Sequence, residues 1–246
     1  MRAIPLIILF ASAFLLSACT SDVVKVDKSK ESSRINVELG ITYMGQGDLN
    51  TAMNRLQKAI HQDPENPLAY SSMAILNMRL SQLDEAEQNF EKAIKIAPDN
   101  SSIRNNYGAF LCQQKRYQQA QEQFMQALKN PLYQTPEHAY LNAGKCTDNK
   151  EEAEKYFRAA LRNNPVFPGA LLEMARLNLE KERYLSARAY LQRYHAVHEP
   201  DAVSLWTSIQ VEKMLGDKDT MQKHALMLQH KFPDSEETRQ YLLWKK

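Results

Sequence analysis

A pattern of small, large apolar and proline residues recurs about every 34 residues along most of this chain. Its three most regular copies begin at Gly40, Ala74 and Gly108, each followed twelve residues later by an alanine. A large apolar residue, a second alanine and a proline then follow at matching or nearly matching distances. These positions hold Ala52, Ala86 and Ala120, then Leu56, Phe90 and Phe124, then Ala59, Ala93 and Ala127, and last Pro64, Pro98 and Pro131. A unit this short cannot bury a core alone, so the copies must stack on one another.

The period and spacing resemble the tetratricopeptide repeat, a helix–turn–helix unit that stacks into a solenoid and serves as a binding scaffold. We therefore predict an all-α tetratricopeptide-repeat solenoid, with six helical hairpins over residues 33–233 and a C-terminal capping helix over residues 234–246. Prolines after each second helix support this prediction, because proline removes a backbone donor and cannot continue a helix. The Gly-Asp pairs at 47–48 and 216–217 mark turns between helices, where glycine tolerates a positive φ.

The fourth and sixth units depart from the pattern. Only nine residues separate Gly144 from Ala153, where the first three units have twelve. We interpret this difference as a three-residue deletion at the turn between the two helices of the fourth unit. The sixth unit has Met221 where alanine is expected.

The N-terminus predicts export and a lipid anchor. Arg2 precedes an apolar run, residues 4–16, that is too short to cross a bilayer as a helix. The run leads into Leu16-Ser17-Ala18-Cys19, which resembles the bacterial lipoprotein signal. The resemblance implies that residues 1–18 are a removed signal peptide and that Cys19 is lipidated, with fatty acids such as palmitate. The alternative is an ordinary signal peptide followed by an incidental cysteine.

Residues 19–32 are then the lipidated cysteine and a flexible tether, because the stretch is polar and has no apolar periodicity. Thr20 and Ser21 follow Cys19, so no aspartate stands directly after it. By analogy with lipoprotein sorting in Gram-negative bacteria, this implies an outer-membrane, lipid-anchored protein that faces the periplasm.

Composition and motifs argue against catalysis and nucleic-acid binding. The 31 Lys and Arg residues nearly balance 29 Asp and Glu residues, so no basic surface for nucleic acid is expected. The chain has no nucleophile-elbow, zinc-protease or phosphate-loop motif. His195 and His198 have the spacing of a ligand pair, but no third ligand lies nearby in sequence. We predict a protein that is not an enzyme, with no catalytic residues, no cofactor and no metal.

Two cysteines besides Cys19 remain, Cys112 and Cys146, and they are 34 residues apart. One repeat length places them at equivalent points on the first helices of neighbouring units, which pack side by side. In the oxidising periplasm they can therefore form a disulfide. The alternative is a pair of buried small residues that never join.

In tetratricopeptide arrays the first helix of each unit lines the concave face. The corresponding positions of the first two units hold an apolar stripe: Val37, Ile41, Met44, Leu68, Ile75 and Met78. The stripe predicts an adaptable hydrophobic groove that receives an apolar segment of a protein partner. The alternative is that the curvature of the array, or the preceding tether, closes over these side chains.

Several segments that no generic repeat requires resemble one family, the type IV pilus biogenesis and stability lipoproteins known as PilF or PilW. They are NNYGAFLC at 105–112, NPLYQTPEHAYLNAGKC at 130–146, NPVFPGALLEMARL at 164–177, LSARAYLQRY at 185–194, SLWTSIQVEKMLGD at 204–217 and KFPDSEET at 231–238. Together with the lipoprotein signal, they extend the resemblance over essentially the whole chain after residue 18.

The resemblance implies a pilotin: an outer-membrane lipoprotein that binds the type IV pilus secretin subunit. We expect the protein to be monomeric when free. Binding would promote outer-membrane localisation and multimerisation of the secretin, as pilus biogenesis requires. The alternative is a tetratricopeptide scaffold lipoprotein that serves β-barrel assembly or cell-wall enzymes.

Overall fold

The computed structural model describes residues 28–245, which form thirteen α-helices and no strand. The first three hairpins are α1 (Lys28–Gly45) with α2 (Leu49–Gln62), α3 (Pro67–Arg79) with α4 (Leu83–Ile96), and α5 (Ser101–Gln113) with α6 (Tyr117–Leu128). The next three are α7 (Pro136–Lys145) with α8 (Lys150–Asn163), α9 (Pro168–Glu180) with α10 (Tyr184–Val197), and α11 (Ala202–Leu215) with α12 (Lys218–Lys231), followed by α13 (Glu236–Trp244). The prediction of an all-α tetratricopeptide solenoid is confirmed.

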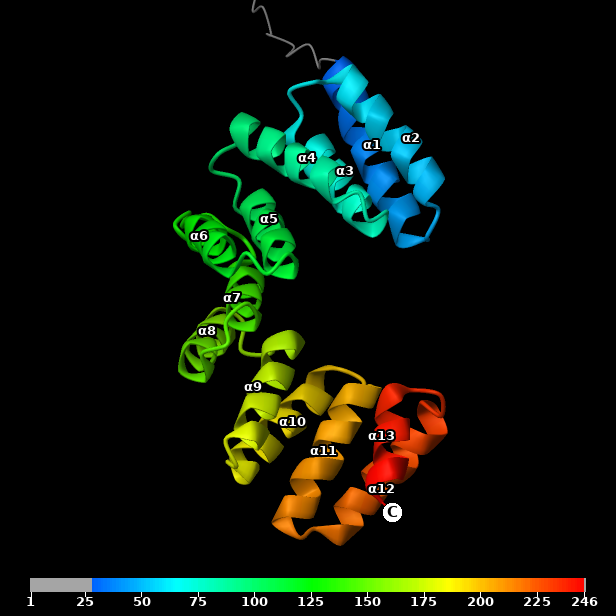
Figure 1. Ribbon diagram of the computed structural model, residues 1–246, viewed down its shortest axis with the longest axis vertical. Helices are drawn as coiled ribbons and strands as arrows, with labels where there is room; N and C mark the ends of the chain where they lie inside the picture. The colour runs from blue at the N-terminus through cyan, green and yellow to red at the C-terminus, as the bar shows by residue number, and fades with distance from the viewer. Residues whose placement is uncertain (1–27, 246) are drawn as a thin grey trace, which may run out of the picture.

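The hairpins stack in chain order along an open arc, with α6 and α8 on its outer side (Figure 1). Each second helix packs on its own first helix and on the first helix of the next unit. Neighbouring first helices also pack together, α1 on α3, α3 on α5 and α5 on α7. The first and last hairpins therefore lie at opposite ends of the arc, far apart in space.

Close approach within a hairpin explains the small residue that opens each copy of the repeat. A Cβ atom added at Gly108 would lie 2.6 Å from Cε1 of Phe124, and one added at Gly144 would lie 2.5 Å from Cε1 of Phe157. Phe124 is fully buried, as are Phe90 and Leu56 at the same repeat position. The glycine thus makes room for the large side chain that fills the hairpin.

Helix ends are set by local chemistry. Asn66, Asn100 and Asn149 each accept a hydrogen bond from a backbone N–H in the first turn of the helix that follows. The second helices α2 and α4 end two residues before Pro64 and Pro98, as expected from the lost donor and ring clash of proline.

The turns between helices repeat one backbone conformation at one repeat position. Gly47 and Gly216 have φ values of +82° and +75°. The equivalent residues of the second, third and fifth units are not glycines, yet they adopt the same left-handed conformation: Ser81 at +60°, Lys115 at +59° and Glu182 at +57°. The turn geometry is therefore imposed by the packing of the two helices it joins, whether or not glycine is present.

The first helix begins earlier than predicted. We expected a tether through residue 32, but α1 starts at Lys28. Its first turns are held by side-chain hydrogen bonds to the end of α2: Ser29 donates to the Gln62 carbonyl, and the buried Ser33 hydroxyl donates to the Ala59 carbonyl at 2.8 Å. These polar contacts leave no apolar periodicity, which is why the sequence pattern missed this part of the helix.

The deletion in the fourth unit lies in a helix, contrary to our interpretation. Helix α7 has 10 residues, whereas α3, α5 and α9 have 13, and the turn that follows α7 is not shortened. Loss of three residues removes close to one helical turn, so the remaining side chains keep their orientation toward α8. A turn between antiparallel helices is already near its minimum length and cannot lose three residues.

Candidate partner-binding groove

The first helices of units one to three, α1, α3 and α5, line a cleft of about 350 Å³. The lining side chains are both apolar and polar. They are Ile41, Met44, Gly45, Leu68, Ser71, Ser72, Ile75, Arg79, Ser102, Ile103 and Asn106. We call this cleft the N-terminal groove.

Four of the six predicted groove residues lie together in it. Ile41 and Leu68 are the most accessible, with 50% and 48% of their surface exposed. Ile75 is half-buried between them and the interior, where it packs against the cores of the first and second hairpins. Met44 also lines the groove but is almost completely buried. The accessible apolar surface is therefore provided mainly by Ile41 and Leu68.

The other two predicted residues do not line the groove. Val37 is buried against Ala59 and Ala69, and Met78 packs beside the core around Phe90. Both face the interfaces between helices, where burial of an apolar side chain is favoured by about 1.5–3 kcal/mol. Position in the repeat did not separate these two side chains from the accessible ones, because Val37 lies about one helical turn from Ile41, and Met78 about one turn from Ile75, on the same helix face.

The groove also has polar members that our apolar stripe did not include. Arg79 donates from Nη1 to the Met44 carbonyl at 2.6 Å, so it satisfies a carbonyl at the end of α1 and ties α1 to α3. Ser102 and Asn106 add a hydroxyl and an amide group that can pair with the backbone of an extended peptide, whereas Ser71 is buried. Among the described residues that line the groove there is no carboxylate.

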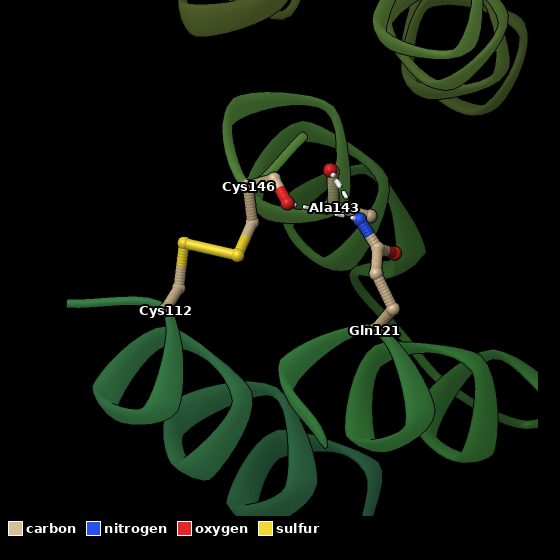
Figure 2. The surroundings of a disulfide bond; sticks show 4 residues. All are labelled: Cys112, Gln121, Ala143 and Cys146. Carbon is tan, nitrogen blue, oxygen red and sulfur yellow. Dashed lines mark hydrogen bonds between the residues drawn. A yellow bond between two sulfur atoms is a disulfide. The ribbon is translucent and has the colours of Figure 1, made fainter. Parts of the chain in front are cut away.

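A disulfide joins the third and fourth units close to the middle of the arc. Cys112, in the last turn of α5, is bonded to Cys146, which caps α7, and their Cα atoms lie 5.8 Å apart (Figure 2). Gln121 of α6 adds a second link, because its amide donates to the Ala143 carbonyl at 2.8 Å and to the Cys146 carbonyl at 3.3 Å. The end of the short helix α7 is thus anchored to both helices of the preceding hairpin.

The other candidate residues are Cys19 and the histidine pair His195 and His198. Cys19, the predicted lipidation site, lies outside the described residues. His195 packs beside His224, with ring centroids 5.9 Å apart, whereas a ring nitrogen of His198 lies 2.7 Å from the Glu199 carbonyl oxygen. Within residues 28–245 no group of three or more His, Cys, Asp or Glu residues is placed to hold a metal ion, and no helix is long and apolar enough to cross a membrane.

Comparison with protein families identifies the repeat. The tetratricopeptide repeat matches residues 65–130 and again 147–197, and a TPR repeat matches residues 40–81. These matches cover five of the predicted units in whole or in part. They agree with the helical hairpins of the structure.

Two proteins of type IV pilus biogenesis are similar to this chain over nearly their whole length. The type IV pilus assembly protein PilF of Pseudomonas aeruginosa is 28% identical over 242 residues, which cover 95% of this chain and 96% of PilF. The solved structure of that PilF superposes with a TM-score of 0.78 and covers 88% of this chain and 99% of its own. PilW, a widely conserved type IV pilus biogenesis factor of known structure, is 33% identical with a TM-score of 0.76, over 85% of this chain and 98% of PilW. The chain therefore belongs to the PilF/PilW family of tetratricopeptide-repeat type IV pilus biogenesis proteins.

Proposed function

We propose that this protein is an outer-membrane lipoprotein pilotin: it binds the type IV pilus secretin subunit and promotes its outer-membrane localisation and multimerisation. Membership of the PilF/PilW family supports the role in pilus biogenesis. The observation that carries the binding function is the N-terminal groove, where Ile41 and Leu68 expose apolar surface on a tetratricopeptide array. Such exposed apolar surface in a concave site is typical of peptide recognition.

In this proposal the groove holds an apolar segment of the secretin protomer. Ile41, Leu68 and Ile75 contact its side chains, while the Ser102 hydroxyl and the Asn106 amide bind its backbone. A cleft of about 350 Å³ has room for two or three side chains. Burial of each large apolar side chain contributes about 1.5–3 kcal/mol, which suits a reversible complex that must release the protomer into the multimer.

In this mechanism the lipid on Cys19 attaches the protein to the outer membrane. Eight residues lie between Cys19 and the start of α1 at Lys28, and the nine Cα–Cα steps allow a reach of at most about 30 Å from the membrane. Several acyl chains on the mature cysteine make the attachment stable, because a single chain anchors only weakly. A secretin protomer held in the groove would therefore be kept close to the membrane in which it assembles.

The test is deletion of the gene in its native host, followed by a blot for detergent-resistant secretin multimers in outer-membrane fractions. We expect the multimers to disappear while the monomer persists. Wild-type protein should restore them and Cys19→Ala should not. Multimers at normal level and location in the deletion strain would reject the pilotin function. Co-purification with β-barrel assembly components or murein hydrolases would then favour the alternative scaffold function.

A further inference from the structure

Helices α11, α12 and α13 line a second and larger cleft. These three helices lie at the opposite end of the arc from α1 and α2 (Figure 1). The volume of the cleft is about 530 Å³. Its lining combines lysines with large apolar and aromatic side chains, among them Lys213, Lys218, Leu226, Tyr241, Trp244 and Lys245. We call this the C-terminal cleft. It shares no lining residue with the N-terminal groove.

The cleft exists because the last helix is short. Helix α13 has 9 residues, whereas the first helices α3, α5 and α9, which each cover the second helix before them, have 13. Part of α12 is therefore left uncovered. Lys218, Met221, Gln222, Ala225, Leu226 and Gln229 line the cleft along one stripe of this helix. Their spacing of three and four residues defines a single helix face about 16 Å long, and Leu226 is 67% exposed on it.

The opposite wall is aromatic and fixed in place. Trp244 contacts Trp206 edge-to-face, with ring centroids 5.4 Å apart. The ammonium group of Lys213 lies 3.7 Å from the centroid of the Trp244 ring. Tyr241 is buried beneath them. An indole held from two sides loses little conformational freedom on binding, which makes Trp244 a suitable contact residue.

The rim of the cleft is positively charged. Lys213, Lys218 and Lys245 stand around it and are exposed. Among the described residues that line the cleft the one carboxylate is Glu212, and this side chain is buried in an ion pair with Arg188. An occupant therefore meets an apolar floor between cationic side chains, and charge complementarity calls for acidic groups beside its apolar ones.

We propose that the C-terminal cleft binds a short segment of a partner protein in which acidic residues flank apolar side chains. A second copy of this chain fits poorly, because a two-fold contact would place the lysine-rich rim against itself. A lipid bilayer fits less well, because a flat surface would leave a hollow of about 530 Å³ unfilled, whereas the side chains of a peptide can enter it.

The test uses the purified full chain without its lipid and a displayed library of random peptides as the probe. We expect enriched peptides that combine Leu, Phe or Trp with Asp or Glu. The affinity of the protein for a synthetic copy of an enriched peptide should fall at least about tenfold with Leu226→Glu. It should not change with Leu185→Glu, a matched control because Leu185 is 71% exposed on α10 and does not line the cleft.

The contribution of charge is tested by reversing the charge on each partner in turn. Lys218→Glu should weaken binding of the enriched peptide several-fold. Exchange of the acidic residues of the peptide for lysine should restore binding to that variant. The double variant Ile41→Asp with Leu68→Asp should bind the peptide normally, so failure of the N-terminal groove and failure of this cleft are distinguishable. Enrichment of peptides without acidic residues, or binding indifferent to Leu226→Glu, would overturn the proposal.

Two further outcomes would overturn it in favour of another occupant. The first is a dimer in sedimentation analysis that Leu226→Glu converts to monomer, which would assign the cleft to a second copy. The second is flotation of the unlipidated chain with vesicles of phosphatidylethanolamine and phosphatidylglycerol, lost in Leu226→Glu, which would assign it to the membrane.

Discussion

Cys112 and Cys146 are bonded at the ends of two neighbouring first helices, with Cα atoms 5.8 Å apart and one repeat length, 34 residues, between them in the chain. The bond joins the last regular hairpin to the one whose first helix is a turn short. The fourth unit has less helix to pack on its neighbours, and the covalent link lies where that loss occurs.

Removal of this bond should destabilise the whole array. Closure of a 34-residue loop contributes about 3–4 kcal/mol on the chain-entropy model, so Cys112→Ser with Cys146→Ser should lower the free energy of unfolding by roughly that amount. Urea denaturation monitored by circular dichroism measures the change. A reductant should destabilise the wild type and leave the double variant unaffected. Equal stability of both proteins under oxidising conditions would contradict the prediction.

Charged substitutions in the N-terminal groove should leave the fold intact but abolish partner binding. The double substitution Ile41→Asp with Leu68→Asp replaces two half-exposed apolar side chains by carboxylates. Because neither position is part of the buried core, helicity and melting temperature should change little. Affinity for the secretin subunit should fall at least about a hundredfold, because two apolar contacts are replaced by groups that resist desolvation. Fluorescence anisotropy or calorimetry with purified secretin domains provides the measurement. Leu185→Asp on α10 is the matched exposed control and should bind like the wild type.

The strained turns offer a stabilising substitution. Lys115 and Glu182 are exposed and have φ values of +59° and +57°. Replacement of either by glycine should raise the free energy of unfolding by about 0.5–1 kcal/mol, because glycine adopts this conformation without a Cβ clash. The reverse change, Gly47→Ala, should destabilise by about 1 kcal/mol, and since no atom lies within 4 Å of the added Cβ, the effect isolates the backbone. Thermal melts of the three variants measure these changes in stability. A loss of stability in both glycine variants would contradict the prediction that Lys115 and Glu182 are strained in the left-handed conformation.

A carboxylate between units four and five should make stability depend on pH. Glu154 of α8 accepts from Lys181 at 2.9 Å and from Arg158 at 2.7 Å, and these contacts lower its pKa to about 2. A pKa below the unfolded value means that the stabilisation is fully present above about pH 5 and is lost as the pH falls toward 2. Glu154→Gln should therefore cost about 1–2 kcal/mol at pH 7 and much less near pH 2.5.

The comparison for Glu154 is between wild type and variant at each pH, since other carboxylates titrate in both proteins. Glu38→Gln is the control, because Glu38 is 62% exposed and its one ion-pair partner among residues 28–245 is Arg34, on its own helix. That substitution should change the free energy of unfolding by less than about 0.5 kcal/mol. A Glu154→Gln effect that does not shrink on acidification would show that the side chain acts by packing alone.

The repeat pattern was sufficient to predict the fold, because each hairpin obeys the same local rule. Small residues such as Gly108 pair with large ones such as Phe124, and prolines such as Pro98 end the second helices. These constraints act between residues close in sequence, so they can be read from spacing. The start of α1 at Lys28 was missed because Ser29 and Ser33 secure it through hydrogen bonds to α2, contacts that leave no apolar signature.

The groove was predicted less completely. Spacing brought Ile41, Met44, Leu68 and Ile75 to one cleft but could not show that Val37 and Met78 turn into helix interfaces. Which of two neighbouring apolar side chains stays accessible depends on how closely the next helix approaches. That distance is set by the packing of three helices together.

The repeat, its all-α class and the positions of the hairpins follow from periodicity and from the conformational limits of glycine and proline, so they can be predicted from the chain alone. The packed helices were needed to show where the shortening of the fourth unit falls, which apolar side chains remain exposed, and that α13 leaves a cationic cleft beside α12. Accessible surfaces and cavities depend on how two surfaces meet. They exist only once helices distant in sequence have packed.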